Sequence, residues 1–327
     1  MPRCAESANS RCLFAVTAAV RTNGTKNALR RAAVGSLLLC LTLLSSMAWA
    51  HGDPGLQAGV QGWNLNPQLL ALLGFAILLY GLGLLRLWRQ AGWGRGAKRW
   101  QVMCYVTGLL FVAVALISPL DGMASELSSA HMLQHVILIV VAAPLLVLAL
   151  PLPVFLWALP SSVRRRLPVL KQAWINTLWP LLTMPFVAWA LHAIALWVWH
   201  APVLYQAALR DPLVHDLEHA SFFVTALLFW WAVFRSGGER AAPGIPIALL
   251  FTTVMHSGVL GALMTFAVVP WYPAYGQASL RWGITPLEDQ QLAGLLMWVP
   301  AGFVYLIAAL GILAKWLSRL ERIRIQV

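Results

Sequence analysis

The chain has 327 residues, of which 60% are hydrophobic and only 10% are charged, and its mean hydropathy is +0.73. A soluble domain is about 45–50% apolar and about 25% charged, so this composition excludes a soluble globular fold and indicates a polytopic membrane protein. The net charge of +12 would favour nucleic-acid binding in a soluble protein. Here the basic residues lie in loops between apolar segments, as membrane topology requires, and we expect no nucleic-acid partner.

The first fifty residues have the pattern of a secretory leader. A long polar and basic stretch ends in an Arg pair at 30–31, which precedes an apolar run at 32–44 and an Ala-x-Ala site that ends at Ala50. These are the three regions of a signal peptide. We expect cleavage after Ala50, which leaves a short extracytoplasmic segment, 51–67. An uncleaved signal anchor is the alternative.

Seven apolar segments follow, each near the 20 residues that a bilayer requires. They predict an all-α membrane bundle of seven transmembrane helices over residues 68–317, followed by a cytoplasmic tail, 318–327. The predicted spans are Gln68–Trp88, Trp100–Ser118, Leu127–Leu150, Asn176–Val198, Leu213–Phe234, Ile245–Val269 and Leu292–Leu317. The connecting loops are too short for a second, soluble domain.

The distribution of Lys and Arg predicts the orientation of the bundle. The segments after the first, third, fifth and seventh spans hold nearly all of the basic residues that follow the leader, whereas the opposite loops carry only Arg210 and Arg281. The positive-inside rule therefore places the mature N-terminus outside and the C-terminus in the cytoplasm. The predicted leader independently indicates the same orientation.

Two histidine pairs are the main candidates for chemistry. His131 and His135 begin the third span, and His215 and His219 begin the fifth, so both pairs lie on the outer side of the predicted bundle. Residues four apart on a helix share a face, with Cβ atoms about 5–6 Å apart. Polar side chains in a bilayer usually face the bundle interior or a partner. One such pair fits a structural or a ligand role equally well, but two pairs at one depth favour metal ligation.

Further residues are candidates for the same metal. Imidazole suits copper, zinc, iron and nickel, and a nearby thioether shifts the preference toward Cu(I). His256 and Met255, near the middle of the sixth span, form a possible deeper relay position, although a methionine in a span is more often apolar filling. Asp289 is a candidate hard ligand, an acceptor for an imidazole N–H, or a charge at a helix start. The four cysteines contain no Cys-x-x-Cys motif, which excludes a thiol relay.

Three other functions remain open at this point. A haem needs one axial histidine from each of two facing helices, and the four-residue spacing suits a compact metal site better, although one haem with a spare histidine per helix is possible. The sequence His215-x-x-Glu218-His219 matches an inverted zinc-protease motif with Glu218 as general base, or Glu218 orients the imidazoles. A copper or proton transporter would need polar groups that continue to the cytoplasmic face.

Five motifs in this order resemble the CtaG family of cytochrome c oxidase assembly factors, the type associated with caa3 oxidases. They are Ser118-Pro-Leu-Asp121, Ser129-Ala-His-Met-Leu-Gln-His135, His215-Asp-Leu-Glu-His219, His256-Ser-Gly and Asp289-Gln-Gln-Leu-Ala-Gly-Leu-Leu-Met-Trp298. The likeness covers about residues 68–317. Any single motif is weak, but the combination is specific.

The resemblance implies a function and a set of site residues. The family comprises multi-span membrane proteins needed to make active oxidase, with an inferred role in copper delivery. The residues on its motif positions are His131, His135, His215, His219, His256 and Asp289. We therefore expect a non-enzymatic assembly factor in the bacterial plasma membrane that binds copper as Cu(I). The expected partners are cytochrome c oxidase subunits, membrane lipid and an extracytoplasmic copper chaperone. The alternatives are a haem-b electron carrier and a copper transporter.

Overall fold

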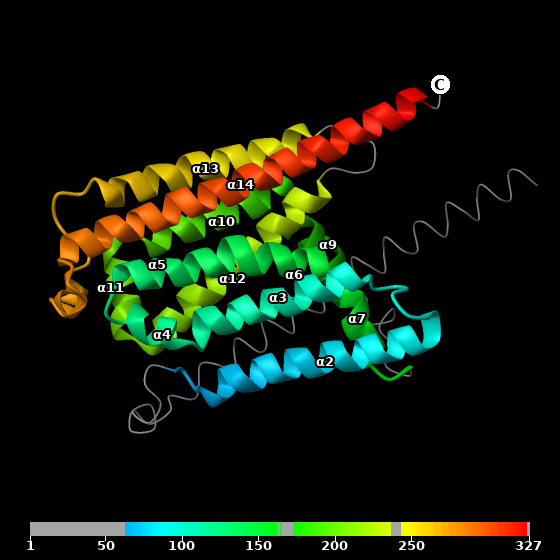
Figure 1. The fold of residues 1–327 in the computed structure, drawn as a ribbon, viewed down its shortest axis with the longest axis horizontal. Helices are drawn as coiled ribbons and strands as arrows, with labels where there is room; N and C mark the ends of the chain where they lie inside the picture. The colour runs from blue at the N-terminus through cyan, green and yellow to red at the C-terminus, as the bar shows by residue number, and fades with distance from the viewer. Residues whose placement is uncertain (1–62, 162–163, 165–172, 237–242, 326–327) are drawn as a thin grey trace, which may run out of the picture.

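The computed structural model describes residues 63–161, 164, 173–236 and 243–325 (Figure 1). This part of the chain is helical and contains no β-strand, so the predicted all-α fold is confirmed. The predicted leader, its cleavage site and most of the segment 51–67 lie outside the described residues.

Six helical segments in the described residues are long and apolar enough to cross a membrane, which agrees with the predicted polytopic bundle. They are α2 (Pro67–Ala91), α3 (Arg99–Leu116), the continuous segment Ser128–Ala149, α12 (Pro212–Arg235), α13 (Gly244–Thr265) and α14 (Pro286–Ile325). A seventh candidate is a bent pair, α10 (Pro185–Trp199) and α11 (Pro202–Arg210), whose axes differ by 75°. The described residues therefore contain six or seven candidate spans.

The predicted fourth span, Asn176–Val198, is not one continuous helix in the structure. The chain over this region forms α9 (Ala173–Leu182) and α10, which are separated at Thr183 and Met184. Pro185 begins α10, and a proline restricts the residue before it to extended backbone, so Met184 has φ −59° and ψ 133°. The apolar run has no gap in hydropathy here, but the proline ends the helix.

The third span changes its helical geometry beside the histidines. It begins as α5 (Ser128–Val136), continues as the π-helical segment η3 (Ile137–Ala142) and ends as α6 (Ala143–Ala149). π-Helical turns are rare and frequent at functional sites. The indole N–H of Trp230 on α12 donates to the carbonyl of Ile139 at 2.8 Å, which ties the π-helical segment to the fifth span. This segment begins two residues after His135.

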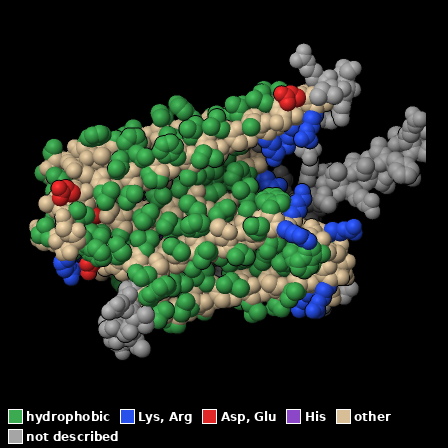
Figure 2. Space-filling model, in the orientation of Figure 1, with side chains coloured by type: hydrophobic (Ala, Val, Ile, Leu, Met, Phe, Trp, Pro, Cys, Tyr) green, Lys and Arg blue, Asp and Glu red, His purple; other side chains and the backbone are tan. Residues whose placement is uncertain are grey.

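The helices form a bundle whose outer surface is apolar. Figure 1 shows α2 at one edge, α13 and α14 at the other, and α5, α6, α10 and α12 between them. The buried core lies between these central helices and the inner faces of α13 and α14, and it includes Phe222, Phe229 and Met264. Hydrophobic side chains cover most of the visible face in Figure 2, as expected for a surface in contact with lipid.

Charge separates the two ends of the bundle. Lys and Arg side chains gather at the end where the C-terminus lies, which we call the basic end (Figure 2). The starts of α5 and α12, which carry the histidine pairs, lie at the opposite end (Figure 1). This arrangement agrees with the positive-inside prediction, and the side of the membrane that each end faces stays a prediction.

The remaining described helices are short. They are α4 (Pro119–Ala124), α7 (Pro151–Ala158), and the 3-10 turns η4 (Pro273–Tyr275) and η5 (Ala278–Trp282). The two 3-10 turns lie in the loop between α13 and α14, so they sit at the histidine end of the bundle.

Glycines allow α13 and α14 to pack backbone against backbone. A Cβ at Gly294 would lie 2.6 Å from the carbonyl oxygen of Gly261 and 2.7 Å from the amide nitrogen of Thr265. Small residues at such crossings let transmembrane helices approach closely, and packing there replaces the missing hydrophobic driving force. No side chain fits at Gly294 unless the helices separate.

We expect Gly294→Ala to lower the free energy of unfolding by about 1–3 kcal/mol, the usual effect of overpacking. Gly302→Ala on the same helix is the matched control, because a Cβ at Gly302 meets no atom within 4 Å. Equilibrium unfolding in mixed detergent micelles measures both variants. Equal stability of the two alanine variants would contradict close packing at Gly294.

Candidate metal centre

The start of α5 is held by a residue from the last helix. Asp289 of α14 accepts hydrogen bonds from the backbone N–H groups of Ser128 (2.6 Å) and Ser129 (3.1 Å) and from the Ser129 hydroxyl (2.5 Å). Leu127, at the N-cap position, has no side-chain oxygen for this purpose. A carboxylate at a helix N-terminus satisfies free donors and interacts well with the helix dipole. This contact fixes the turn that precedes His131.

A second buried contact supports the same segment from the side. Gln134 donates to Asp121 Oδ1 at 2.9 Å and to the Ala115 carbonyl at 2.7 Å, and Asn64 donates to Asp121 Oδ2 at 2.8 Å. Burial raises the pKa of the Asp121 carboxyl above its ordinary value, and these hydrogen bonds oppose that effect. The contacts orient α5 about its axis, so that its histidines face α12.

The start of α12 follows common rules for helix initiation. Asp211 at the N-cap accepts from the N–H of Leu213 at 2.8 Å, and Pro212 occupies the first helical position, where no N–H is needed. One turn later come His215, Glu218 and His219. Their spacing of three and four residues places all three side chains on one face of the helix.

The two histidine pairs converge in the bundle interior. Within the pairs, ring centroids are 4.4 Å apart for His131 and His135 and 4.3 Å for His215 and His219. Between the helices, His131 lies 5.3 Å from His215 and 5.8 Å from His219, and His135 lies 5.0 Å from His219. The structure thus brings together the four histidines that the sequence singled out. We call these four residues with Glu218 the histidine cluster.

Glu218 lies between the imidazoles. Its Oε2 is 3.4 Å from Nε2 of His131, and its Oε1 is 3.8 Å from Nε2 of His135. Its side chain is fully buried, and His131 and His135 are 1% and 3% exposed. Within the described residues, neither carboxylate oxygen and none of the four ring nitrogens of His131 and His135 has a hydrogen-bond partner. A buried polar atom without a partner costs about 1–3 kcal/mol. This arrangement fits a cation that would bind several of these atoms at once.

Two groups of three donors have the spacing of a metal site. One contains His131, His135 and His219, and the other contains His131, His215 and Glu218, with the donor atoms of each group within 4.8 Å of one another. His131 belongs to both groups and is therefore the central ligand candidate. Imidazole nitrogens with one carboxylate oxygen suit a borderline or soft transition metal rather than calcium or magnesium.

Aromatic side chains enclose the cluster. Tyr205 on α11 lies 5.1 Å from the His131 ring, and Phe222 on α12 lies 4.7 Å from the His135 ring. Tyr205 stacks on Tyr272 at 3.8 Å and contacts the Tyr275 hydroxyl at 3.1 Å, so the loop after α13 covers this end. Burial raises the pKa of Tyr272 and Tyr275, and both phenols stay neutral. The bend between α10 and α11 is what places Tyr205 here.

Three predicted site residues do not join the cluster. The Met255 side chain is 50% exposed on the outside of α13. His256 contacts Trp189 with ring centroids 5.8 Å apart and belongs to neither donor group. Asp289 caps α5, so of the three roles considered for it the structure shows the helix-terminal charge, although on α5 rather than on its own helix.

The structure also shows a contact and a role that the sequence did not predict. His200 and Met132 contact each other across 68 positions of sequence, and no local pattern links them. Glu218 was considered only as a general base or an orienting residue. Its position three residues after His215 and one before His219 was the available signal that it faces the cluster.

Fold and site together define a polytopic helical membrane protein with a buried histidine–carboxylate cluster near one end of the bundle. The family model for the cytochrome c oxidase caa3 assembly factor (Caa3_CtaG) matches residues 78–319, which include every residue of the cluster. The chain belongs to this family, and the resemblance seen in its motifs is confirmed. Comparisons with curated proteins and with solved structures gave no match.

Proposed function

We propose that this protein supports oxidase assembly by holding copper as Cu(I) in the histidine cluster and releasing it to an oxidase subunit by ligand exchange. The observation that carries the proposal is the convergence of four imidazoles and one carboxylate, in which both oxygens of the buried Glu218 and all ring nitrogens of the buried His131 and His135 lack a hydrogen-bond partner among the described residues. Family membership supplies the process, since the matching model describes a caa3 oxidase assembly factor. The protein then acts as a carrier and catalyses no reaction.

Charge balance favours a monovalent ion. Neutral imidazoles with the ionised Glu218 carboxylate carry one negative charge, which Cu(I) neutralises and a divalent ion exceeds. An uncompensated charge in a low-dielectric interior is unfavourable by several kcal/mol. Imidazole is also a suitable ligand for copper. Zinc binding would be the main competing result, and metal analysis distinguishes the two.

The position of the cluster suits delivery from the outer side. It lies at the end of the bundle opposite the basic end, and the positive-inside rule assigns that end to the extracytoplasmic side. A copper chaperone on that side would supply the ion, and an oxidase subunit in the same membrane would accept it. Tyr205, Tyr272 and Tyr275 would have to move for the ion to pass.

The same geometry disfavours the alternatives. The rings approach to between 4.3 and 5.8 Å, and the adjoining cavity of about 30 Å³ has room for roughly one or two waters but not for a haem macrocycle. A transporter needs a polar route to the basic end, but the cavity ends beside Tyr305, whose ring lies 5.6 Å from that of Trp230 in the apolar core. Purified protein is therefore expected to show no Soret band.

Deleting the gene is expected to leave an oxidase with its haem but with little of its copper. Complementation with wild-type protein restores the copper, complementation with His131→Ala does not, and complementation with His256→Ala does, because His256 lies outside the cluster. Elemental analysis of the purified oxidase measures its copper, and optical spectra measure its haem. Full copper content in the oxidase of the deletion strain would show that the protein steadies an unfinished subunit without supplying copper.

A further inference from the structure

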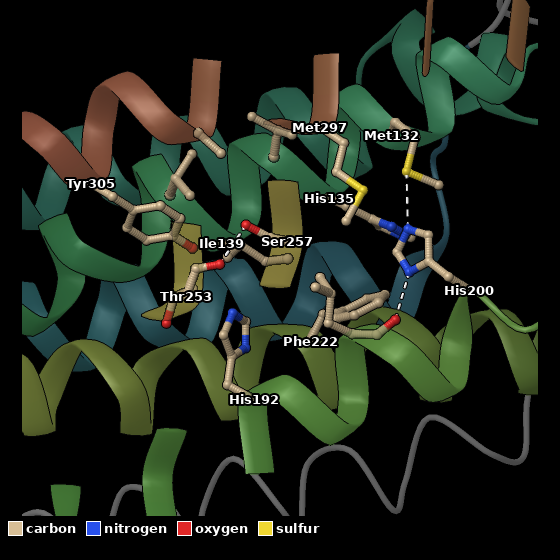
Figure 3. Close-up of a pocket in the computed structure, with 14 residues that line it drawn as sticks. Met132, His135, Ile139, His192, His200, Phe222, Thr253, Ser257, Met297 and Tyr305 are labelled. Carbon is tan, nitrogen blue, oxygen red and sulfur yellow. Dashed lines mark hydrogen bonds between the residues drawn. The ribbon is translucent and has the colours of Figure 1, made fainter. Parts of the chain in front are cut away.

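A small cavity adjoins the histidine cluster on the inner side of His135 (Figure 3). Its volume is about 30 Å³, and His135 lines it as well as belonging to the cluster. The part nearest His135 is lined by uncharged sulfur and nitrogen donors from three parts of the chain: Met132 of α5, Met297 of α14, and His200 at the end of α10. The deeper part is lined by His192, Thr253 and Ser257.

The hydrogen bonding of His200 fixes which ring nitrogen faces the Met132 sulfur without a proton. Nδ1 of His200 lies 2.7 Å from the carbonyl oxygen of Leu196, which only accepts, so Nδ1 carries the proton. In the neutral ring Nε2 then has a free lone pair, and it points at the Met132 sulfur at 3.4 Å (Figure 3). A thioether is itself an acceptor. Two acceptors that face each other in a buried site are complementary to a shared cation.

The distance between these two atoms fits a common ligand sphere. At bond lengths of about 2.1 Å to nitrogen and about 2.3 Å to sulfur, like those of zinc sites, a separation of 3.4 Å corresponds to an angle of about 100° at a shared ion, close to tetrahedral. The Met297 sulfur points toward His200 and His135 in Figure 3 and can supply a third donor. Met132 and Met297 are 1% and 6% exposed, so both thioethers are shielded from bulk solvent.

We propose that His200, Met132 and Met297 form a second Cu(I) site beside the histidine cluster. Neutral nitrogen and thioether donors select the monovalent ion. This inference deepens the proposed function and rests on it, because the His135 ring borders both positions and can pass the ion between them by exchange of ligands. Copper remains Cu(I) throughout, so the transfer requires no electron donor or acceptor. The histidine cluster and this second site, which we call the soft site, would then hold two Cu(I) ions with different affinities.

Anaerobic titration of the purified full chain with Cu(I) against a chromophoric chelator tests the proposal. Wild-type protein is expected to bind two equivalents, and X-ray absorption is expected to show both nitrogen and sulfur neighbours. Met132→Leu combined with Met297→Leu should bind one equivalent and show no sulfur. Exchange of methionine for leucine nearly conserves volume, so the fold should persist. Met264→Leu, at a buried methionine of the core outside this cavity, is the control and should retain both equivalents.

The failure of this inference and the failure of the proposed function give different results. His131→Ala removes a ligand of the cluster only and should leave the equivalent that has sulfur neighbours. His200→Gln leaves both thioethers in place but removes the imidazole nitrogen, so this variant should lose the equivalent that has sulfur neighbours. One wild-type equivalent without sulfur neighbours would overturn the soft site while leaving the cluster intact, and so would two equivalents in the double methionine variant. A sulfur-coordinated ion alone would instead contradict the histidine cluster.

Discussion

His131→Ala is expected to lose the imidazole-coordinated copper almost completely. His131 belongs to both donor groups, and its Nε2 lies closer to the Glu218 carboxylate than that of His135, so neither donor group survives its removal. Removing even an outer residue that orients a ligand commonly weakens metal binding by about 10–100-fold, so loss of this ligand should exceed about 100-fold. Competition of the purified protein with a Cu(I) chelator measures the affinity.

His256→Ala is the matched control for that experiment. It removes an imidazole from a neighbouring membrane helix, but one that contacts Trp189 instead of the cluster. His219→Ala provides a second test from the other helix and should act in the same direction as His131→Ala. If His131→Ala and wild-type protein bound copper with equal affinity, the assignment of the cluster as a metal centre would be wrong.

Asp289→Asn is expected to reduce both stability and metal binding. The carboxylate accepts three hydrogen bonds at the start of α5, and an amide in its place would turn an NH₂ group toward an N–H donor. Hydrogen bonds to a charged group contribute about 1.5–3 kcal/mol each, so a loss of about 2–4 kcal/mol in the free energy of unfolding is expected. Detergent unfolding curves and the Cu(I) affinity of the folded fraction measure the two effects.

Glu288→Gln is the control for Asp289→Asn because it removes the same charge from the next residue. Glu288 is exposed and accepts from the N–H of Thr285 at 2.7 Å at the start of its own helix, a contact that the glutamine oxygen can keep. Its effect on stability should be much smaller than that of Asp289→Asn, because interactions of exposed charges contribute little. Similar losses in the two variants would show that the charge at the α14 start matters rather than the cap on α5.

Both histidine pairs could be found in the sequence because their spacing is local. Residues four apart on a helix share a face whatever the rest of the fold does, and a polar face in a membrane segment turns inward. The pairing of the two helices was an inference from depth, and the structure places the rings within 6 Å of each other. Glu218 follows from the same local spacing once both pairs are known to face each other.

The roles of Asp289, Met255 and His200 depend on contacts between distant segments. Asp289 lies 160 residues from Ser129, which it caps, and the sequence shows only that it lies near a helix start. Met255 precedes a histidine in the sequence but lies on the outward face of α13. His200 acquires a thioether neighbour from a helix 68 residues away. Local periodicity carries no information on such contacts.

The sequence by itself determined the class of this protein, because burial of apolar side chains in lipid and the exclusion of charge from it are set by composition along each segment. It also determined that two helices would each present a pair of imidazoles. Only the tertiary structure decided which side chains share a site, because helix packing, the break before Pro185 and the bend between α10 and α11 set how each helix is rotated. Those rotations place Glu218 between the imidazoles and His200 against Met132.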